Sequence, residues 1–223
     1  MLMEQARNEI VKYGKVISKK LTTGTSGNLS IADREKKLVA ISPSGIDYDQ
    51  LTPEDIVIVN FDGDIIEGTK KPSSEVGLHL GIYKQNKNAK AVVHTHALYC
   101  TIFASLNMPL RSVHYVLAST GSDHVPVVEY ATYGSKELAE KVSEKMKDYN
   151  AVLMANHGMV CCADTLKEAV SLADTCEWVA ELQYKCMTIG EPQIVPKEEI
   201  DHVMECFKHY GQEEETETSA HDK

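Results

Sequence analysis

Three short apolar runs follow one another in the first third of the chain with no helix between them. They span residues 38–42, 56–60 and 64–67, and turn-forming residues bound each run. Runs of this length and setting predict β-strands, and Asp62-Gly63 between the last two predicts a hairpin. Neighbouring parallel strands need a long crossover connection, usually a helix. We therefore expect part of the sheet to be antiparallel.

Longer stretches with apolar residues at helical spacing predict the helices. The first covers residues 2–20, where Ile10, Val11 and Ile17 repeat at that spacing. Ser135 is the expected N-cap of a later helix, and Gly190 is expected to end the longest one. Further helices are predicted over residues 72–85, 97–106, 135–149, 164–188 and 197–209.

Strands and loops fill the remaining intervals. Residues 21–30, rich in Gly, Ser and Thr, predict a loop. Strands are predicted over residues 91–96, 151–155 and 159–162, with shorter ones within 111–130. No repeat and no linker divides the 223 residues. We therefore expect one α/β domain in which helices cover both faces of a mixed sheet.

Charge and composition narrow the classes of partner and compartment. Asp and Glu number 33 against 23 Lys and Arg, so neither nucleic acid nor an anionic membrane is an expected partner. No apolar run approaches the roughly 20 residues that span a bilayer. The first residues, MLMEQARNEIVKYGK, lack the apolar core of a secretion signal. The six cysteines form no Cys-x-x-Cys pair, which favours buried free thiols in a cytoplasmic protein.

Histidines and one glutamate form the sharpest chemical signal. His94 and His96 alternate on a predicted strand, so both side chains point to one face and could bind a divalent metal such as zinc. The same pair could be a half-exposed polar face. His157, before a glycine, is either a third ligand or a turn histidine bonded to a carbonyl. Glu75 is either a fourth ligand or an ordinary acidic residue at a helix start.

Three turns rich in Gly and Ser suggest an anion site. They cover residues 24–30, 42–45 and 72–74. Backbone amides in such turns can hold a phosphate, and Ser73 with Ser74 would add the start of a helix. The two serines could equally be a plain helix cap. The first turn matches neither a Walker A loop nor G-x-G-x-x-G. Turns converging on one anion would let an acidic protein bind phosphate without a basic patch.

Eight segments stand in order along the chain: Gly24-Thr-Ser-Gly-Asn28, Ser42-Pro-Ser-Gly45, Pro72-Ser-Ser-Glu75, Val93-His-Thr-His96, His114-Tyr115, Tyr130-Ala-Thr-Tyr-Gly134, Asn156-His-Gly158 and Lys208-His-Tyr-Gly211. Taken together and in this order, they resemble the class II aldolase/adducin family. The resemblance runs from the opening helix to about Gly211 and implies a three-layer α/β/α sandwich around a mixed, mostly antiparallel sheet. We expect a family domain over residues 1–211 and an acidic, mobile tail over 212–223.

The resemblance implies a zinc-dependent aldolase with one Zn²⁺ per subunit. It would cleave a ketose 1-phosphate, with L-fuculose 1-phosphate expected, to dihydroxyacetone phosphate and L-lactaldehyde. The implied assembly is a C4 homotetramer with sites at subunit boundaries. The implied metal ligands are Glu75, His94, His96 and His157, with Glu75 also the general base. The implied substrate-binding residues are Thr25, Gly27, Asn28, Ser44, Gly45, Ser73 and Ser74.

Three tyrosines complete the implied site. Tyr115 would move a proton at the aldehyde, while Tyr133 and Tyr210 would shape the aldehyde pocket, the latter across a subunit boundary. The aldolases of the family carry Phe where this chain has Tyr133, which bears on the choice of aldehyde. An L-ribulose-5-phosphate 4-epimerase, which shares fold and metal, is disfavoured by Glu75 and Tyr115. A 5-deoxyribulose-1-phosphate or methylthio-type aldolase stays open, and an adducin-like interaction domain is the alternative without catalysis.

Overall fold

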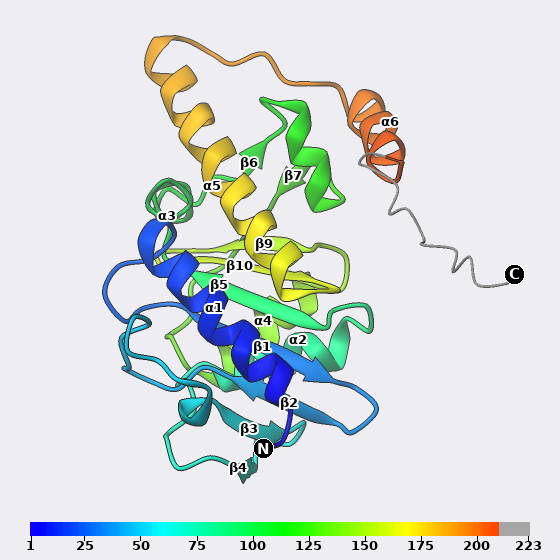
Figure 1. Ribbon diagram of the computed structural model, residues 1–223. Helices are drawn as coiled ribbons and strands as arrows, with labels where there is room; N and C mark the ends of the chain where they lie inside the picture. The colour runs from blue at the N-terminus through cyan, green and yellow to red at the C-terminus, as the bar shows by residue number, and fades with distance from the viewer. Residues whose placement is uncertain (210–223) are drawn as a thin grey trace, which may run out of the picture.

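An eight-stranded sheet runs through the centre of the molecule in the order β4-β3-β2-β1-β5-β10-β9-β8 (Figure 1). The computed structural model of the chain describes residues 1–209. Neighbouring strands are antiparallel except for the parallel pair β8 and β9, which confirms the predicted mixed, mostly antiparallel sheet. The strands are β1 (Asn28–Asp33), β2 (Leu38–Ile41), β3 (Val57–Asn60), β4 (Ile65–Glu67), β5 (Ala91–Thr95), β8 (Val127–Val128), β9 (Ala151–Met154) and β10 (Gly158–Ala163). A separate two-stranded sheet pairs β6 (Leu110–Arg111) with β7 (His124–Val125).

Helices cover both faces of the large sheet, which gives the predicted three layers (Figure 1). One face packs against α1 (Glu4–Lys20), α3 (Leu98–Ser105) and α5 (Leu166–Ile189). The other packs against α2 (Val76–Gln85) and α4 (Lys136–Lys145). Successive residues of β5 enter different cores, because strand side chains alternate between faces: Val93 joins the first and Val92 the second.

Two short 3-10 helices and a last α-helix complete the described chain. The 3-10 helices are η1 (Pro53–Asp55) and η2 (Tyr115–Thr120), and the last helix is α6 (Lys197–Phe207). An extended connection separates α6 from the end of α5, and α6 packs against η2 (Figure 1). The predicted hairpin at Asp62-Gly63 joins β3 to β4. Ser135 caps α4 as predicted, since its side chain accepts a hydrogen bond from the Leu138 N–H.

Two local predictions were wrong, and both errors lie beside the site. The stretch 21–30 is not a loop throughout, because β1 begins at Asn28 and pairs with both β2 and β5. Asn28 and Ser30 of this strand are polar although they are buried, so the sequence did not predict a strand here. The helix predicted from residue 72 begins at Val76 instead. Residues 72–74 are held in a non-helical turn, where Pro72 forms a bridge with Pro43.

The structure also shows the state of the cysteines and whether any described helix could cross a membrane. All six cysteines are free; Cys100, Cys161, Cys162 and Cys176 are buried, as predicted, whereas Cys186 is half-buried and Cys206 is exposed. Within residues 1–209, no helix has the length and apolar character that crossing a membrane requires.

Candidate active site

Two histidines at the end of β5 point toward a common centre. β5 is the central strand between β1 and β10, and its β-branched residues Val92, Val93 and Thr95 are buried. His94 and His96 leave the same face of this strand, and their Nε2 atoms lie 3.0 Å apart. His94 Nδ1 lies 2.8 Å from the Met159 carbonyl of β10, so in the neutral ring it donates there and leaves the Nε2 lone pair toward the centre.

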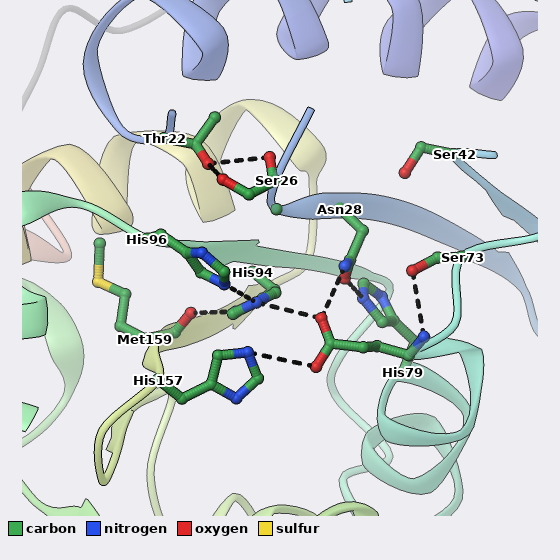
Figure 2. A network of polar contacts seen from close by, with 12 residues as sticks. Thr22, Ser26, Asn28, Ser42, Ser73, His79, His94, His96, His157 and Met159 are labelled. Atoms are coloured by element: carbon green, nitrogen blue, oxygen red, sulfur yellow. Dashed lines mark hydrogen bonds and ion pairs between the residues drawn. The ribbon is translucent and has the colours of Figure 1, made fainter. Parts of the chain in front are cut away.

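His157 joins the pair from the turn between β9 and β10. Figure 2 shows the rings of His94, His96 and His157 facing one another. One ligand atom from each lies within 4.8 Å of the others. Gly158 makes this approach possible, because a Cβ there would lie 2.4 Å from the Thr95 carbonyl oxygen and 3.1 Å from the His96 ring. Asn156 bends the turn with a left-handed φ of 55°.

Glu75, the residue before α2, brings a carboxylate to the three histidines. Its Oε2 lies 3.2 Å from His94 Nε2, and its Oε1 lies 3.5 Å from His157 Nε2. Glu75 is buried, yet Oε1 makes no hydrogen bond within residues 1–209. A buried carboxylate with one oxygen that makes no hydrogen bond, next to a cluster of three imidazoles, fits a divalent metal site with nitrogen and oxygen ligands.

Charges in this cluster depend on one another. Burial raises the pKa of Glu75, but the charge of His94 and hydrogen bonds from His94 and Asn28 outweigh burial and hold the pKa well below 4.5. Burial lowers the pKa of His94, and the Glu75 carboxylate reverses this, so the pKa rises above 6.5. Burial and the nearby His94 lower the pKa values of His96 and His157 to about 4. These two rings are therefore neutral at pH 7, the state in which imidazole binds a metal.

A cavity of about 410 Å³ opens beside the cluster and brings the predicted substrate-binding residues together. Gly27 has a φ of 79°, and a Cβ there would lie 2.8 Å from the His94 carbonyl oxygen, so only glycine fits this turn without strain. No Lys or Arg borders the cavity within residues 1–209. The lining includes Thr25, Gly27, Asn28, Ser44, Gly45, Ser73, Ser74 and Tyr133, together with Glu75, His96 and His157.

The structure does not bring every predicted tyrosine to this cavity. Tyr133 lies on its rim with 69% of its surface exposed. Tyr115 does not line the cavity of its own chain; it begins η2, is half exposed, and stacks near His114 and Phe207. Tyr210 and the tail lie outside the described residues, so their predicted roles and the domain boundary at 211 stay predictions.

Sequence reasoning missed a buried polar cluster beneath the site. His79 received no role in the sequence analysis, but its ring contacts Asn28 and Ser30, and Ser30 contacts Tyr83. Spacing could have indicated it, because residues 28 and 30 share one face of a strand and residues 79 and 83 share one face of a helix. Tyr130 and Asn156 also border the cavity although neither was assigned a role.

Comparison with known proteins identifies the family to which the chain belongs. Residues 8–184 match the model of the class II aldolase and adducin N-terminal domain. The chain belongs to this family. Aldolases of class II depend on a metal ion, and His94, His96 and His157 could hold one in this member.

Similar proteins extend the match over nearly the whole chain. A 5-deoxy-D-ribulose 1-phosphate aldolase of Bacillus thuringiensis serovar kurstaki is 45% identical over 96% of this chain and 100% of its own. An L-fuculose phosphate aldolase of Escherichia coli O6:H1 is 39% identical over 86% of this chain and 88% of its own. A solved L-fuculose 1-phosphate aldolase superposes with a TM-score of 0.90, at 41% identity, over 93% of this chain and 98% of its own. The chain is accordingly a class II aldolase, an aldehyde-lyase.

Proposed function

We propose that this aldolase cleaves a ketose 1-phosphate between C3 and C4, releasing dihydroxyacetone phosphate and a small aldehyde. One observation carries the proposal: a single cavity is bordered both by a candidate metal cluster with Glu75 and by three turns suited to a phosphate. Cleavage of a phosphorylated ketose needs both parts side by side. A purely structural metal site would need no phosphate turns.

The phosphate would be held by neutral donors. The turns at residues 25–28, 44–45 and 73–74 offer backbone N–H groups and the hydroxyls of Thr25, Ser44 and Ser74. With no Lys or Arg among the described lining residues, hydrogen bonds to the anion replace a salt bridge. Binding energy from this remote group orients the carbon that reacts.

Glu75 would exchange a proton with C3 of the three-carbon donor. A zinc ion held by His94, His96 and His157, with Glu75 as a further ligand in the site without substrate, would supply Lewis-acid stabilisation of the negative charge that develops on the ketose. Glu75 is the carboxylate among the described lining residues, and its low pKa keeps it ionised at neutral pH. It can therefore take the C3 proton in condensation and return it after cleavage.

The proton at the aldehyde oxygen would come from another subunit. Tyr115 is half exposed and does not border the cavity of its own chain, so the predicted role requires Tyr115 of a neighbouring copy. A second copy would then complete the site. We propose the homotetramer with sites at subunit boundaries, in which Tyr210 would add a further wall. The free thiols fit the cytoplasmic location that we also propose.

The preferred ketose is proposed as 5-deoxy-D-ribulose 1-phosphate, with L-fuculose 1-phosphate second. The relative named for the former is 45% identical over its full length, while the fuculose phosphate aldolase is 39% identical over 88% of its length. The two substrates share the phosphorylated three-carbon half and differ in the aldehyde released, acetaldehyde against L-lactaldehyde. Tyr133 borders the same cavity, so its hydroxyl bears on the choice between these two aldehydes.

A cleavage assay on four sugar phosphates tests the proposal. The panel is 5-deoxyribulose 1-phosphate, L-fuculose 1-phosphate, L-rhamnulose 1-phosphate and L-ribulose 5-phosphate, with dihydroxyacetone phosphate and the C4 epimer both measured. We expect dihydroxyacetone phosphate from at least one ketose 1-phosphate, fastest from the first, and no epimer from the last. Epimerisation of ribulose 5-phosphate without any cleavage would replace the aldolase proposal with the epimerase. No turnover of any compound would favour an interaction domain.

A further inference from the structure

A chain of buried polar side chains runs from Glu75 into the core between β1 and α2. Asn28 Nδ2 lies 3.0 Å from Glu75 Oε2, and Asn28 Oδ1 lies 2.5 Å from His79 Nε2 (Figure 2). His79 Nδ1 lies 2.6 Å from Ser30 Oγ, which lies 2.7 Å from the Tyr83 hydroxyl. Asn28, Ser30, His79 and Tyr83 are each at most 5% exposed, so water does not compete for these contacts.

The chemistry of Glu75 gives the hydrogen bonds one direction. An ionised carboxylate only accepts, so the Asn28 amide must turn its N–H toward Glu75 and its oxygen toward His79. His79 Nε2 must then carry the proton and donate to that oxygen. The neutral ring has a bare Nδ1, which accepts from the Ser30 hydroxyl, and Ser30 in turn accepts from Tyr83.

We propose that His79 is a positioning residue that fixes the side-chain amide of Asn28 for the reaction. The inference rests on the proposed function, because it assigns Asn28 to holding the Glu75 carboxylate and bordering the substrate cavity. Without a donor at His79 Nε2, only the contact with Glu75 opposes the flipped amide, whose oxygen would face the Glu75 carboxylate. The flipped state repels Glu75 and displaces it from the reacting carbon.

The hydrogen-bond chain transmits orientation and not protons. An amide does not pass a proton readily between its nitrogen and its oxygen, so Asn28 separates Glu75 from the His79 ring. Asn28 also stands directly opposite His94 in the register of β1 and β5. The same amide therefore lies between the candidate metal cluster, the base and the substrate cavity, and its orientation affects turnover more than metal content.

Two amide substitutions at residue 79 form a matched pair. In His79→Gln the new amide nitrogen reaches the place of Nε2 and keeps a donor for Asn28. In His79→Asn the shorter amide reaches only the place of Nδ1, so contact with Ser30 survives and the donor to Asn28 is lost. We expect kcat within about threefold of the wild type for His79→Gln and ~10–100-fold lower for His79→Asn, the range expected for a misplaced reacting group. KM should change less than kcat, and both variants should bind the same zinc per chain.

Tyr83→Phe supplies the control at the far end of the chain. It removes one hydroxyl from the same buried network but leaves the Asn28, His79 and Ser30 contacts in place, so kcat should stay within about twofold. Losses of equal size in His79→Gln, His79→Asn and Tyr83→Phe would show a general packing defect and overturn the proposal. Wild-type kcat in a folded His79→Asn would overturn it as well.

Nitrogen NMR of the wild-type protein tests the same inference without activity or a foldable variant. In ¹⁵N-histidine-labelled protein, the residue 79 ring should be neutral, with Nε2 protonated and Nδ1 bare; its signals are those missing from the His79→Gln spectrum, or, if that variant does not fold, those assigned by through-bond correlation. A ring protonated at Nδ1 would reverse the chain of hydrogen bonds and refute the proposal. If the wild type cleaved no sugar phosphate, the proposed function would fail, while this measurement would still decide the direction of the chain.

Discussion

At the scale of single residues, the site depends on a few close contacts. The carboxylate of Glu75 is placed by His94 and Asn28, and the ring of His157 reaches the centre because residue 158 has no side chain. Substitutions at Glu75 and Gly158 should therefore have different effects. One should remove a charge from an intact site, and the other should distort the site itself.

Replacing Glu75 with Gln should leave the fold intact and reduce turnover. Glutamine keeps the shape and can still accept from Asn28, but it cannot take a proton from carbon. A positioned general base contributes ~10²–10⁴-fold, so kcat should fall by that range. Steady-state kinetics with zinc analysis measures it, and Glu140→Gln, an exposed site on α4, is the control. A Glu75→Gln rate within a few-fold of the wild type would remove Glu75 from the role of base.

Gly158→Ala should impair both stability and metal binding. The added methyl would lie 2.4 Å from the Thr95 carbonyl oxygen, so β5 and β10 must move apart near the histidines. Overpacking of this kind costs about 1–3 kcal/mol of unfolding free energy. Gly77→Ala in α2 is the matched control, because a Cβ there meets nothing within 4 Å. Urea unfolding and zinc titration of the two variants would contradict the account if they gave the same result.

At the scale of elements, hydrogen bonds at the helix ends stabilise helices that pack against distant parts of the chain. α5 begins with a capping box in which Thr165 accepts from the Glu168 N–H at 3.2 Å and Glu168 accepts from the Thr165 N–H at 3.0 Å. Thr165→Ala should lower the free energy of unfolding by about 1 kcal/mol and leave cleavage unchanged, because Thr165 does not border the cavity. Ser171→Ala, exposed within the same helix, should not destabilise the protein. Equal unfolding midpoints for the two variants would rule out the cap.

The same local signals explain which elements could be predicted from the sequence. Ser135 and the Asp62-Gly63 turn act on immediate neighbours, so the start of α4 and the β3–β4 hairpin were predictable. β1 was not, because its Asn28 and Ser30 are polar, and only their shared partner His79 on α2 explains why they are buried. For the same reason, the buried network around His79 could not be predicted from the sequence.

Prediction of the site was also limited to residues that are close in the sequence. The alternation of His94 and His96 on a strand predicts their shared face, whereas the approach of His157 and Glu75 depends on how β10 and α2 meet β5. Proximity of those two could be inferred only from the family resemblance. The family resemblance could not predict the position of Tyr115. This residue does not border the cavity of its own chain, so its place at the site depends on the assembly of several chains.

At the scale of the whole molecule, the proposed site is completed by a second copy. Tyr115→Phe and Glu75→Gln should each be nearly inactive alone. Random mixing in a ring of four should give about a quarter of the sites an intact Glu75 beside a neighbour's intact Tyr115, and activity should return to that extent. Subunit exchange followed by a cleavage assay tests this, with exchange proven by differently tagged chains. Proven hetero-oligomers without recovered activity would contradict a shared site.

Metal dependence of cleavage tests the central claim most directly. The protein should be stripped with a chelator, freed of the chelator, and titrated with zinc while release of dihydroxyacetone phosphate from 5-deoxyribulose 1-phosphate and L-fuculose 1-phosphate is followed. We predict no cleavage by the stripped protein, activity that rises linearly to a plateau at one zinc per chain, and no recovery in a His94→Ala/His96→Ala variant. Cleavage at an undiminished rate by protein shown to be free of metal would contradict the account.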